Sequence, residues 1–230
     1  MDMRLKAIAG QIEDGKGFID VGTDHGYLPV ALALSGYGGN IIASDIKSLP
    51  LNTARESAAA AGVSERIEFL LCDGLRLCDP DKIDTIVIAG MGGDMICHIL
   101  DEAEWCMDEG YRLILQPMTH AEVLRYWLVN NGFELLRECM AEDAGTIYQI
   151  IVARFGKTMK LRDSELFTGS FELAQSRELY MSYLGDEIIR FTKALDGLES
   201  AAQKNSGRIK LYGSILHELV KARQGYDAGK

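Results

Sequence analysis

The sequence predicts an α/β domain with a mostly parallel sheet covered on both faces, followed by a C-terminal α-helical hairpin. The 230 residues are 47% hydrophobic and 25% charged, which is typical of a globular chain that buries a sizeable core. Short β-branched runs alternate with helical patterns through the first two thirds of the chain. The last third instead has heptad spacing. We expect a first domain at 1–156 and a second at 170–230.

The first domain starts with three strands and two helices. In chain order these are a strand at 16–22, a helix at 27–35, a strand at 40–45, a helix at 50–61 and a strand at 66–73. The first helix tolerates Pro29 because a proline in the first turn removes no helical hydrogen bond. The second helix is rich in alanine and is expected to end before Gly62.

The rest of this domain continues the alternation and ends with two consecutive strands. The elements are a strand at 83–90, a helix at 94–102, a strand at 111–116, a helix at 119–131, and strands at 132–139 and 146–155. Thr119 followed by Glu122 predicts a capping box at the start of the last helix.

The C-terminal region is expected to form an antiparallel coiled-coil hairpin after a polar linker at 156–169. Apolar residues recur at +3 and +4 steps on both sides of a break at 205–207. They are Met181, Leu184, Ile188, Phe191, Leu195 and Leu198, then Ile209, Tyr212, Leu216 and Leu219. Two amphipathic helices packed flat on the first domain are the alternative.

Charge divides the chain in the same place. Residues 1–154 hold 12 Lys and Arg against 24 Asp and Glu, a net charge of −12, whereas residues 155–230 have a net charge of +2. The acidic domain argues against non-specific coating of nucleic acid, so a basic surface is expected on the C-terminal region. The candidate cations are Arg177, Arg190, Lys193, Lys204, Arg208, Lys210, Lys221 and Arg223.

Other patterns exclude several classes of protein. No apolar run approaches the ~20 residues of a membrane span, and no export signal is visible, so a cytoplasmic protein is expected. The five cysteines form no CxxC pair, which predicts reduced thiols and no metal site. The oligomeric state stays open from the sequence, with a monomer as the expectation.

The segment from Asp20 to Gly26 lies where the first strand ends and the first long helix begins, the usual ligand site of an open parallel sheet. Gly22 and Gly26 allow a sharp turn close to a ligand. Asp24 occupies the place of the second glycine in the dinucleotide fingerprint, and a carboxylate there would repel a pyrophosphate. This excludes an NAD-linked oxidoreductase and favours a cationic ligand.

Two further acidic strand ends extend this site. Asp45, followed by Ile46, is placed to accept hydrogen bonds from a ribose diol, and Asp73, followed by Gly74, could accept an adenine amino group. Together the strand ends describe a nucleoside with a positively charged substituent, which predicts S-adenosyl-L-methionine as the cofactor.

The fourth strand ends in a glycine-rich segment that leaves space for a flat substrate ring. This segment runs from Ala89 and Gly90 through Met91 to Gly93, and the polarisable sulfur of Met91 could contact that ring. Gln116, at the end of the fifth strand, could read a base edge with its neutral amide.

Four motifs carry a resemblance to a known family: DVGTDHGYLP at 20–29, CDGL at 72–75, IAGMGG at 88–93 and LILQP at 113–117. They resemble the bacterial tRNA (adenine(22)-N1)-methyltransferases. The resemblance implies a Rossmann-like class I methyltransferase domain with a seven-stranded sheet, an antiparallel last strand and a C-terminal helical hairpin. The cofactor-binding positions that it implies are Asp20, Gly22, Asp24, Asp45, Asp73, Gly74, Ala89 and Gly90.

The expected reaction is direct in-line methyl transfer to N1 of a tRNA adenine, at position 22 by resemblance. The Asn-Pro-Pro-aromatic signature of many amino-methylating enzymes is missing after the fourth strand, which argues against the exocyclic N6. N1 carries an in-plane lone pair and needs no deprotonation, so positioning should supply most of the catalysis. Asp24 and His25 are expected near the migrating positive charge, with neither as an obligatory base.

Two other functions remain open from the residues alone. One is a methyltransferase for a small metabolite or a protein side chain, which suits the acidic first domain. The other is a non-catalytic module that binds S-adenosyl-L-methionine and joins a partner through its heptads.

Overall fold

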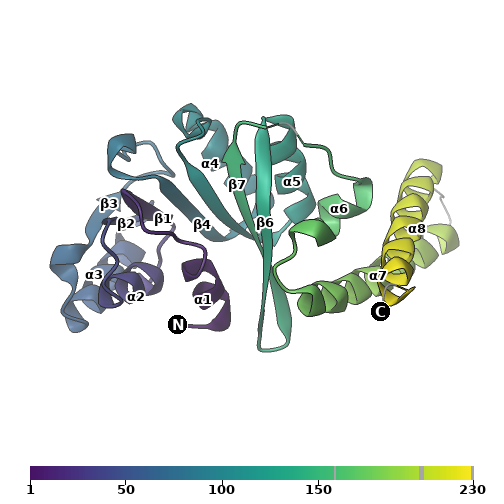
Figure 1. The fold of residues 1–230 in the computed structure, drawn as a ribbon, viewed down its shortest axis with the longest axis horizontal. Helices are drawn as coiled ribbons and strands as arrows, with labels where there is room; N and C mark the ends of the chain where they lie inside the picture. Colours follow the sequence, from purple (N-terminus) through teal and green to yellow (C-terminus); the bar gives the residue numbers. More distant parts are fainter. Residues whose placement is uncertain (158, 202–204, 229–230) are drawn as a thin grey trace.

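The computed structural model describes residues 1–157, 159–201 and 205–228, and its centre is a twisted seven-stranded sheet (Figure 1). The strands are β1 (Gly17–Val21), β2 (Asn40–Asp45), β3 (Glu68–Leu71), β4 (Thr85–Gly92), β5 (Arg112–Thr119), β6 (Phe133–Asp143) and β7 (Thr146–Phe155). Their order is β3-β2-β1-β4-β5-β7-β6, and β7 runs antiparallel to both of its neighbours. The predicted mostly parallel sheet with an antiparallel last strand is confirmed.

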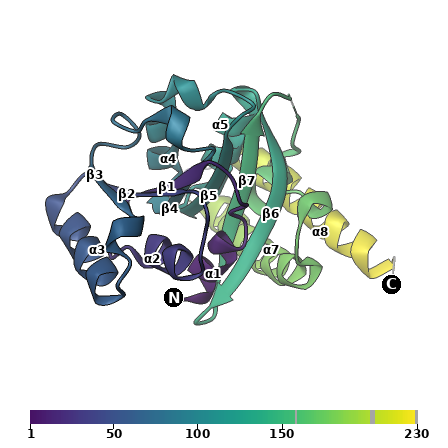
Figure 2. The same cartoon turned by 60° about the vertical axis from the view of Figure 1, so that its left-hand side comes forward.

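Helices cover both faces of the sheet, as Figures 1 and 2 show. The helices are α1 (Met3–Ala9), α2 (Tyr27–Leu34), α3 (Ser48–Ala60), α4 (Gly93–Asp101), α5 (Ala121–Asn130), α6 (Asp163–Thr168), α7 (Arg177–Ser200) and α8 (Ser206–Ala228). Alternate residues of β1 enter two separate cores: Phe18 packs with Ile8 of α1 and Leu28 of α2, and Ile19 belongs to the core beneath α4 and α5. Each buried strand is therefore apolar on both sides.

The structure differs from the sequence prediction at three places. Helix α1 was not predicted, because its apolar pattern spans only seven residues; Asp2 caps it by accepting a hydrogen bond from the Leu5 N–H at 2.7 Å. The predicted linker contains helix α6, which packs against α5. The capping box at 119–122 does not form, because His120 takes a left-handed conformation with φ of 55° and α5 begins only at Ala121.

Helices α7 and α8 pack together as the predicted hairpin, which we call the arm (Figures 1 and 2). Leu184, Phe191 and Leu219 of the predicted seam are buried in its core. Tyr180 and Ile215 join them, although neither belongs to that seam, whereas Leu195 and Leu198 lie outside the cluster of buried residues. The arm also reaches the first domain, since α7 contacts β6, and α8 contacts α6 in the segment between the two.

All five cysteines are buried and unpaired. Burial raises the pKa of the Cys78 and Cys106 thiols to about 12, and that of Cys97 and Cys139 to about 11. Among the helices described, none is long and apolar enough to cross a membrane.

Candidate active site

The loop after β1 is held tightly against β2. The N–H groups of Gly22 and Thr23 both donate to the carbonyl oxygen of Ser44, each at 2.9 Å. Gly22 has a φ of 73°, and a Cβ added there would lie 2.3 Å from Cε of Met91. The left-handed backbone conformation therefore favours glycine at Gly22, and a side chain there would also displace the flexible end of Met91.

Asp24 and Gly26, in the same loop, also have left-handed conformations, with φ of 51° and 70°. Asp24 is exposed, and its carboxylate pairs with His25 Nε2 at 3.5 Å; the His25 ring stacks on Tyr27 with centroids 5.3 Å apart. Gly26 faces α3, where an added Cβ would lie 2.9 Å from the Ala54 Cβ. Gly26 thus allows close helix packing and does not line the cavities below, unlike the other predicted cofactor-binding residues.

Asp20, near the end of β1, is a buried carboxylate beneath this loop. It accepts a hydrogen bond from the Thr23 hydroxyl at 2.7 Å. Burial raises its pKa from the ordinary 3.8 to about 6, against the opposing effects of that hydrogen bond and of the Arg4 charge. A cationic ligand beside Asp20 would favour its ionised form.

A cavity of about 460 Å³ opens at the carboxyl ends of β1 to β4. The predicted residues in its lining are Gly22, Asp45, Ile46, Asp73, Gly74, Ala89, Gly90 and Met91. Asp45 accepts a hydrogen bond from the Lys47 N–H at 2.8 Å through Oδ1 only, and Asp73 pairs with Arg76 at 3.3 Å. Strand ends that are far apart in the sequence therefore meet in one cavity, as predicted.

A second cavity of about 230 Å³ adjoins the first, because Gly22, Ala89 and Gly90 line both. Its lining adds Asp20, Thr23, Asp24, His25 and Tyr27, together with Arg4 of α1. We call the two cavities together the cofactor cleft. The cleft has a larger part between β2, β3 and α4 and a smaller, acidic part below the glycine turn.

Arg4 lines the smaller cavity, although the sequence did not indicate this. Its guanidinium donates to Gln116 Oε1 at 2.8 Å, and the Gly90 N–H donates to the same oxygen at 3.1 Å. Among the described residues that line the smaller cavity, Arg4 is the only permanent cation. The pattern of Leu5 and Ile8 on one helical face was the available signal for α1, but it does not indicate where Arg4 points.

Gln116 does not read a base edge, which corrects the sequence prediction. Its side chain is fully buried; Oε1 binds Arg4 and Gly90, and Nε2 donates to the Pro117 carbonyl at 2.9 Å. The amide therefore links α1, β4 and β5 beneath the cleft.

Helix α4 supplies a wall of the larger cavity that the sequence did not indicate. Met95, His98 and Ile99 line it, and Met95 is about half exposed. An added Cβ at Gly74 would lie 3.2 Å from Ile99, so this glycine lets α4 approach the end of β3. Within the described part of the chain, no three His, Cys, Asp or Glu residues gather so that they could hold a metal ion.

Three comparisons bear on this site. Residues 1–151 match a family model described as a methyltransferase domain. The chain is 29% identical over 216 residues to the tRNA (adenine(22)-N(1))-methyltransferase of Bacillus subtilis, covering 92% of this chain and 91% of that protein.

Two solved structures share the whole fold. One is a candidate tRNA (m1A22) methyltransferase from Streptococcus pneumoniae in complex with S-adenosyl-L-methionine. It is 32% identical with a TM-score of 0.76, and the match covers 93% of this chain and 98% of that one. TrmK from M. capricolum, in complex with S-adenosyl-homocysteine, is 26% identical with a TM-score of 0.80, and the match covers 97% of this chain and 98% of that one.

Proposed function

Because the chain belongs to the tRNA (adenine(22)-N1)-methyltransferase family of methyltransferase-domain proteins, we propose that it methylates N1 of adenine 22 in tRNA with S-adenosyl-L-methionine. The observation that carries the proposal is the two-part cofactor cleft, whose lining unites the ends of the first four strands. The resemblance seen in the four sequence motifs is confirmed at the level of the family.

The larger part of the cleft fits an adenosine. The Oδ2 atom of Asp45 accepts no hydrogen bond from the described residues, so it can bind a ribose hydroxyl. Asp73, which follows the end of β3, can accept a hydrogen bond from the adenine amino group. Ile46 and Ile99 offer apolar contact to the base.

The smaller part fits the charged methionine tail of the same molecule. Asp20 can bind the ammonium group, and the Arg4 guanidinium, held by Gln116, can bind the carboxylate. The opposite charges of Asp20 and Arg4 match the two ends of an amino acid. Assigning Arg4 as a cofactor ligand adds to the residues predicted from sequence.

The cofactor supplies an electrophilic methyl group, and the protein supplies the positioning. Gly90 and Gly92 keep side chains away from the end of β4, which leaves room for a base beside Met91. Asp24 and His25 lie on the loop above, where their charges can stabilise the positive charge that moves onto the base. No residue has to remove a proton from N1.

The N1 edge of adenine is its pairing edge, so the base has to leave its stack before it reacts. We propose that residues 1–156 carry out the reaction and that the arm, within 170–230, contributes cations that bind the RNA. Lys193, Lys210 and Lys221 are exposed on α7 and α8 and form no ion pair with the described residues. Lys204 lies outside those residues.

The test is methyl transfer from labelled S-adenosyl-L-methionine to bulk tRNA, followed by nuclease digestion and mapping of the labelled nucleoside. Label in 1-methyladenosine at position 22 is expected. Label only in protein or in small molecules would favour the alternative methyltransferase, and cofactor binding without transfer would favour the non-catalytic module. Arg4→Gln should raise the KM for the cofactor, with Arg55→Gln, on α3 outside the cleft, as the matched control.

A further inference from the structure

A pocket of about 330 Å³ lies where the first domain meets the arm, next to the cofactor cleft. We call it the junction pocket. The end of β5 and the start of α5 form one wall, from Pro117 to Glu122; the start of β7, from Thr146 to Gln149, forms the second. The third wall comes from Phe167 of α6 and from Tyr183, Glu187 and Arg190 of α7. Its volume is at the small end of the ~300–1,000 Å³ range of ligand pockets.

Two contacts place this pocket beside the site of methyl transfer. Pro117, in its lining, pairs with Met91 of the cofactor cleft across β4 and β5. Tyr148, also in its lining, lies under the Arg4 guanidinium, which is 5.8 Å from the ring centroid and lines the cleft. A nucleotide adjacent to one bound at Met91 would therefore reach the junction pocket.

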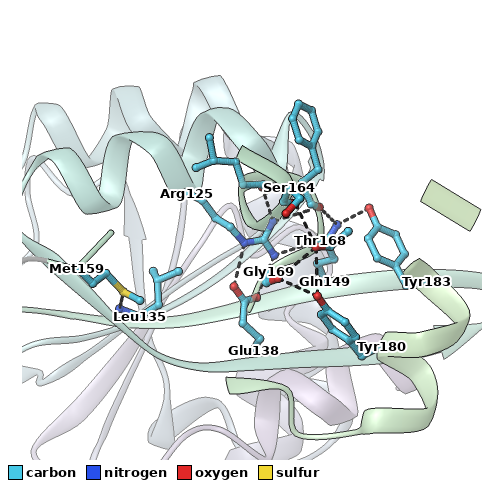
Figure 3. Close-up of polar contacts among 12 residues, drawn as sticks. Arg125, Leu135, Glu138, Gln149, Met159, Ser164, Thr168, Gly169, Tyr180 and Tyr183 are labelled. Carbon is cyan, nitrogen blue, oxygen red and sulfur yellow. Dashed lines mark hydrogen bonds and ion pairs between the residues drawn. The ribbon is translucent and has the colours of Figure 1, made fainter. Parts of the chain in front are cut away.

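A buried polar network holds the pocket walls together (Figure 3). Arg125 of α5 and Glu138 of β6 form a bidentate ion pair with both N···O distances at 2.9 Å, and Arg125 also donates to Gln149. Gln149 Nε2 in turn donates to the Tyr183 hydroxyl at 2.5 Å. Gln149 and Tyr183 line the pocket, so the network fixes this part of its wall.

The charges around the pocket favour a base over a phosphate. Arg190 is neutralised by Glu187 at 2.5 Å, and His120 pairs with Asp94. Glu122 is left as an additional carboxylate, which would repel a phosphate group. Glu122 lines the same pocket as Arg190 and His120.

Glu122 is also free to bind a ligand. The capping box predicted for it does not form, and its side chain accepts no hydrogen bond from the described residues. A carboxylate in this state accepts hydrogen bonds from base amino and imino groups, and aromatic side chains such as Tyr148 offer a stacking surface.

We propose that the junction pocket binds a second nucleobase of the tRNA, adjacent to the methylated adenine, through base N–H groups that donate to Glu122. This inference rests on the proposed function, since it assigns a second RNA subsite to the same reaction. Binding of the second base would keep the extruded adenine at Met91. It would also restrict the enzyme to RNAs that have an amino-bearing base next to the methylated adenine.

The test compares Glu122→Gln with Glu178→Gln in steady-state methylation of a tRNA transcript. Both residues are acidic and lie in the first turn of a helix, but only Glu122 lines the pocket. Glu122→Gln should lower kcat/KM for tRNA about tenfold, as expected for the loss of one bidentate base contact. The KM for S-adenosyl-L-methionine and the calorimetric affinity for S-adenosyl-homocysteine should not change, and Glu178→Gln should behave as wild type.

A second measurement locates the base. Each nucleotide flanking the target is replaced in turn by an abasic nucleotide, and one replacement should cost about tenfold in kcat/KM with the wild-type enzyme and clearly less with Glu122→Gln. Equal kcat/KM values for Glu122→Gln and wild type, or a weaker affinity of Glu122→Gln for S-adenosyl-homocysteine, would overturn the inference alone. A wild-type enzyme that does not methylate tRNA would instead overturn the proposed function, and this inference with it.

Discussion

At the cofactor cleft, glycines bring the backbone close to the ligand site, whereas at the junction with the arm, buried charged side chains hold two parts of the chain together. Gly22 and Gly90 have φ of 73° and 77° and leave the strand ends bare. Arg125 and Glu138, in contrast, are 0% and 1% exposed and hydrogen-bond to each other across α5 and β6. The cleft is shaped by residues without side chains, whereas the junction is held by buried side chains whose polar groups are hydrogen-bonded. We therefore expect substitutions of the cleft glycines to change ligand binding and substitutions of the buried charged pair to change stability.

The largest effect is expected from breaking the junction pair. Arg125→Met leaves the Glu138 carboxylate buried without its partner and should lower the free energy of unfolding by ~3–5 kcal/mol. Urea denaturation followed by circular dichroism measures this. The double variant Arg125→Met with Glu138→Leu should recover most of the loss, because no charge is then left buried. A single variant as stable as wild type would remove the contrast between the two regions.

Next in size is Gly22→Ala, which adds a methyl group in contact with Met91 and a side chain at a left-handed position. We expect the affinity for S-adenosyl-homocysteine to fall roughly 10- to 100-fold, measured by calorimetry. Gly62→Ala is the control, because Gly62 has a φ of 71° but nothing within 4 Å of an added Cβ. If both variants lose affinity equally, backbone strain and not the contact with Met91 is responsible.

A pH effect of about tenfold per unit is expected from Asp20. The pKa of Asp20 is about 6 in the folded protein and 3.8 as its ordinary value. Between these two pH values the folded state binds more protons than the unfolded state. The free energy of unfolding therefore falls as the pH rises through this window. A bound ammonium group favours the ionised carboxylate, so affinity for S-adenosyl-homocysteine should rise with pH up to about 6 and then level off. Calorimetry from pH 5 to 8 should show this slope for wild type and none for Asp20→Asn.

The smallest effect is expected at the edge of the junction. The Tyr180 hydroxyl donates to the Gly169 carbonyl at 3.1 Å and contacts the Thr168 hydroxyl at 3.2 Å. Tyr180→Phe should cost about 1 kcal/mol in the free energy of unfolding. Tyr126→Phe, at an exposed position on α5, is the matched control and should cost nothing measurable. A cost above that of Arg125→Met would mean that the ion pair does not dominate the junction.

The same contrast explains how much could be predicted from the sequence. The strands and the cleft are encoded in short contiguous segments, such as 20–26 and 88–93, where a strand end and its glycines lie together. The predicted strand-end residues therefore line one cleft, although the prediction did not include Arg4 in that lining and gave Gln116 the wrong partner. Each of these errors concerns a side chain that crosses between distant elements.

The junction could not be predicted for the same reason. Arg125, Glu138 and Gln149 are separated in sequence, and each is unremarkable as an isolated polar residue. Only the packing of α5, β6 and β7 brings them together, and the backbone carbonyls of Leu166 and Phe167 complete the set in a segment predicted to be a linker. Hydrophobic periodicity contains no information about such a cluster.

The five buried thiols have a practical consequence for measuring how the arm moves. Thiols with raised pKa values react slowly with maleimides at neutral pH. Two introduced cysteines, Glu199→Cys on the arm and Glu56→Cys on α3, can thus carry a fluorophore pair. Both positions are exposed, and no native cysteine has to be removed. Energy transfer between the two dyes would then report directly whether the arm changes its distance from the first domain when tRNA is added.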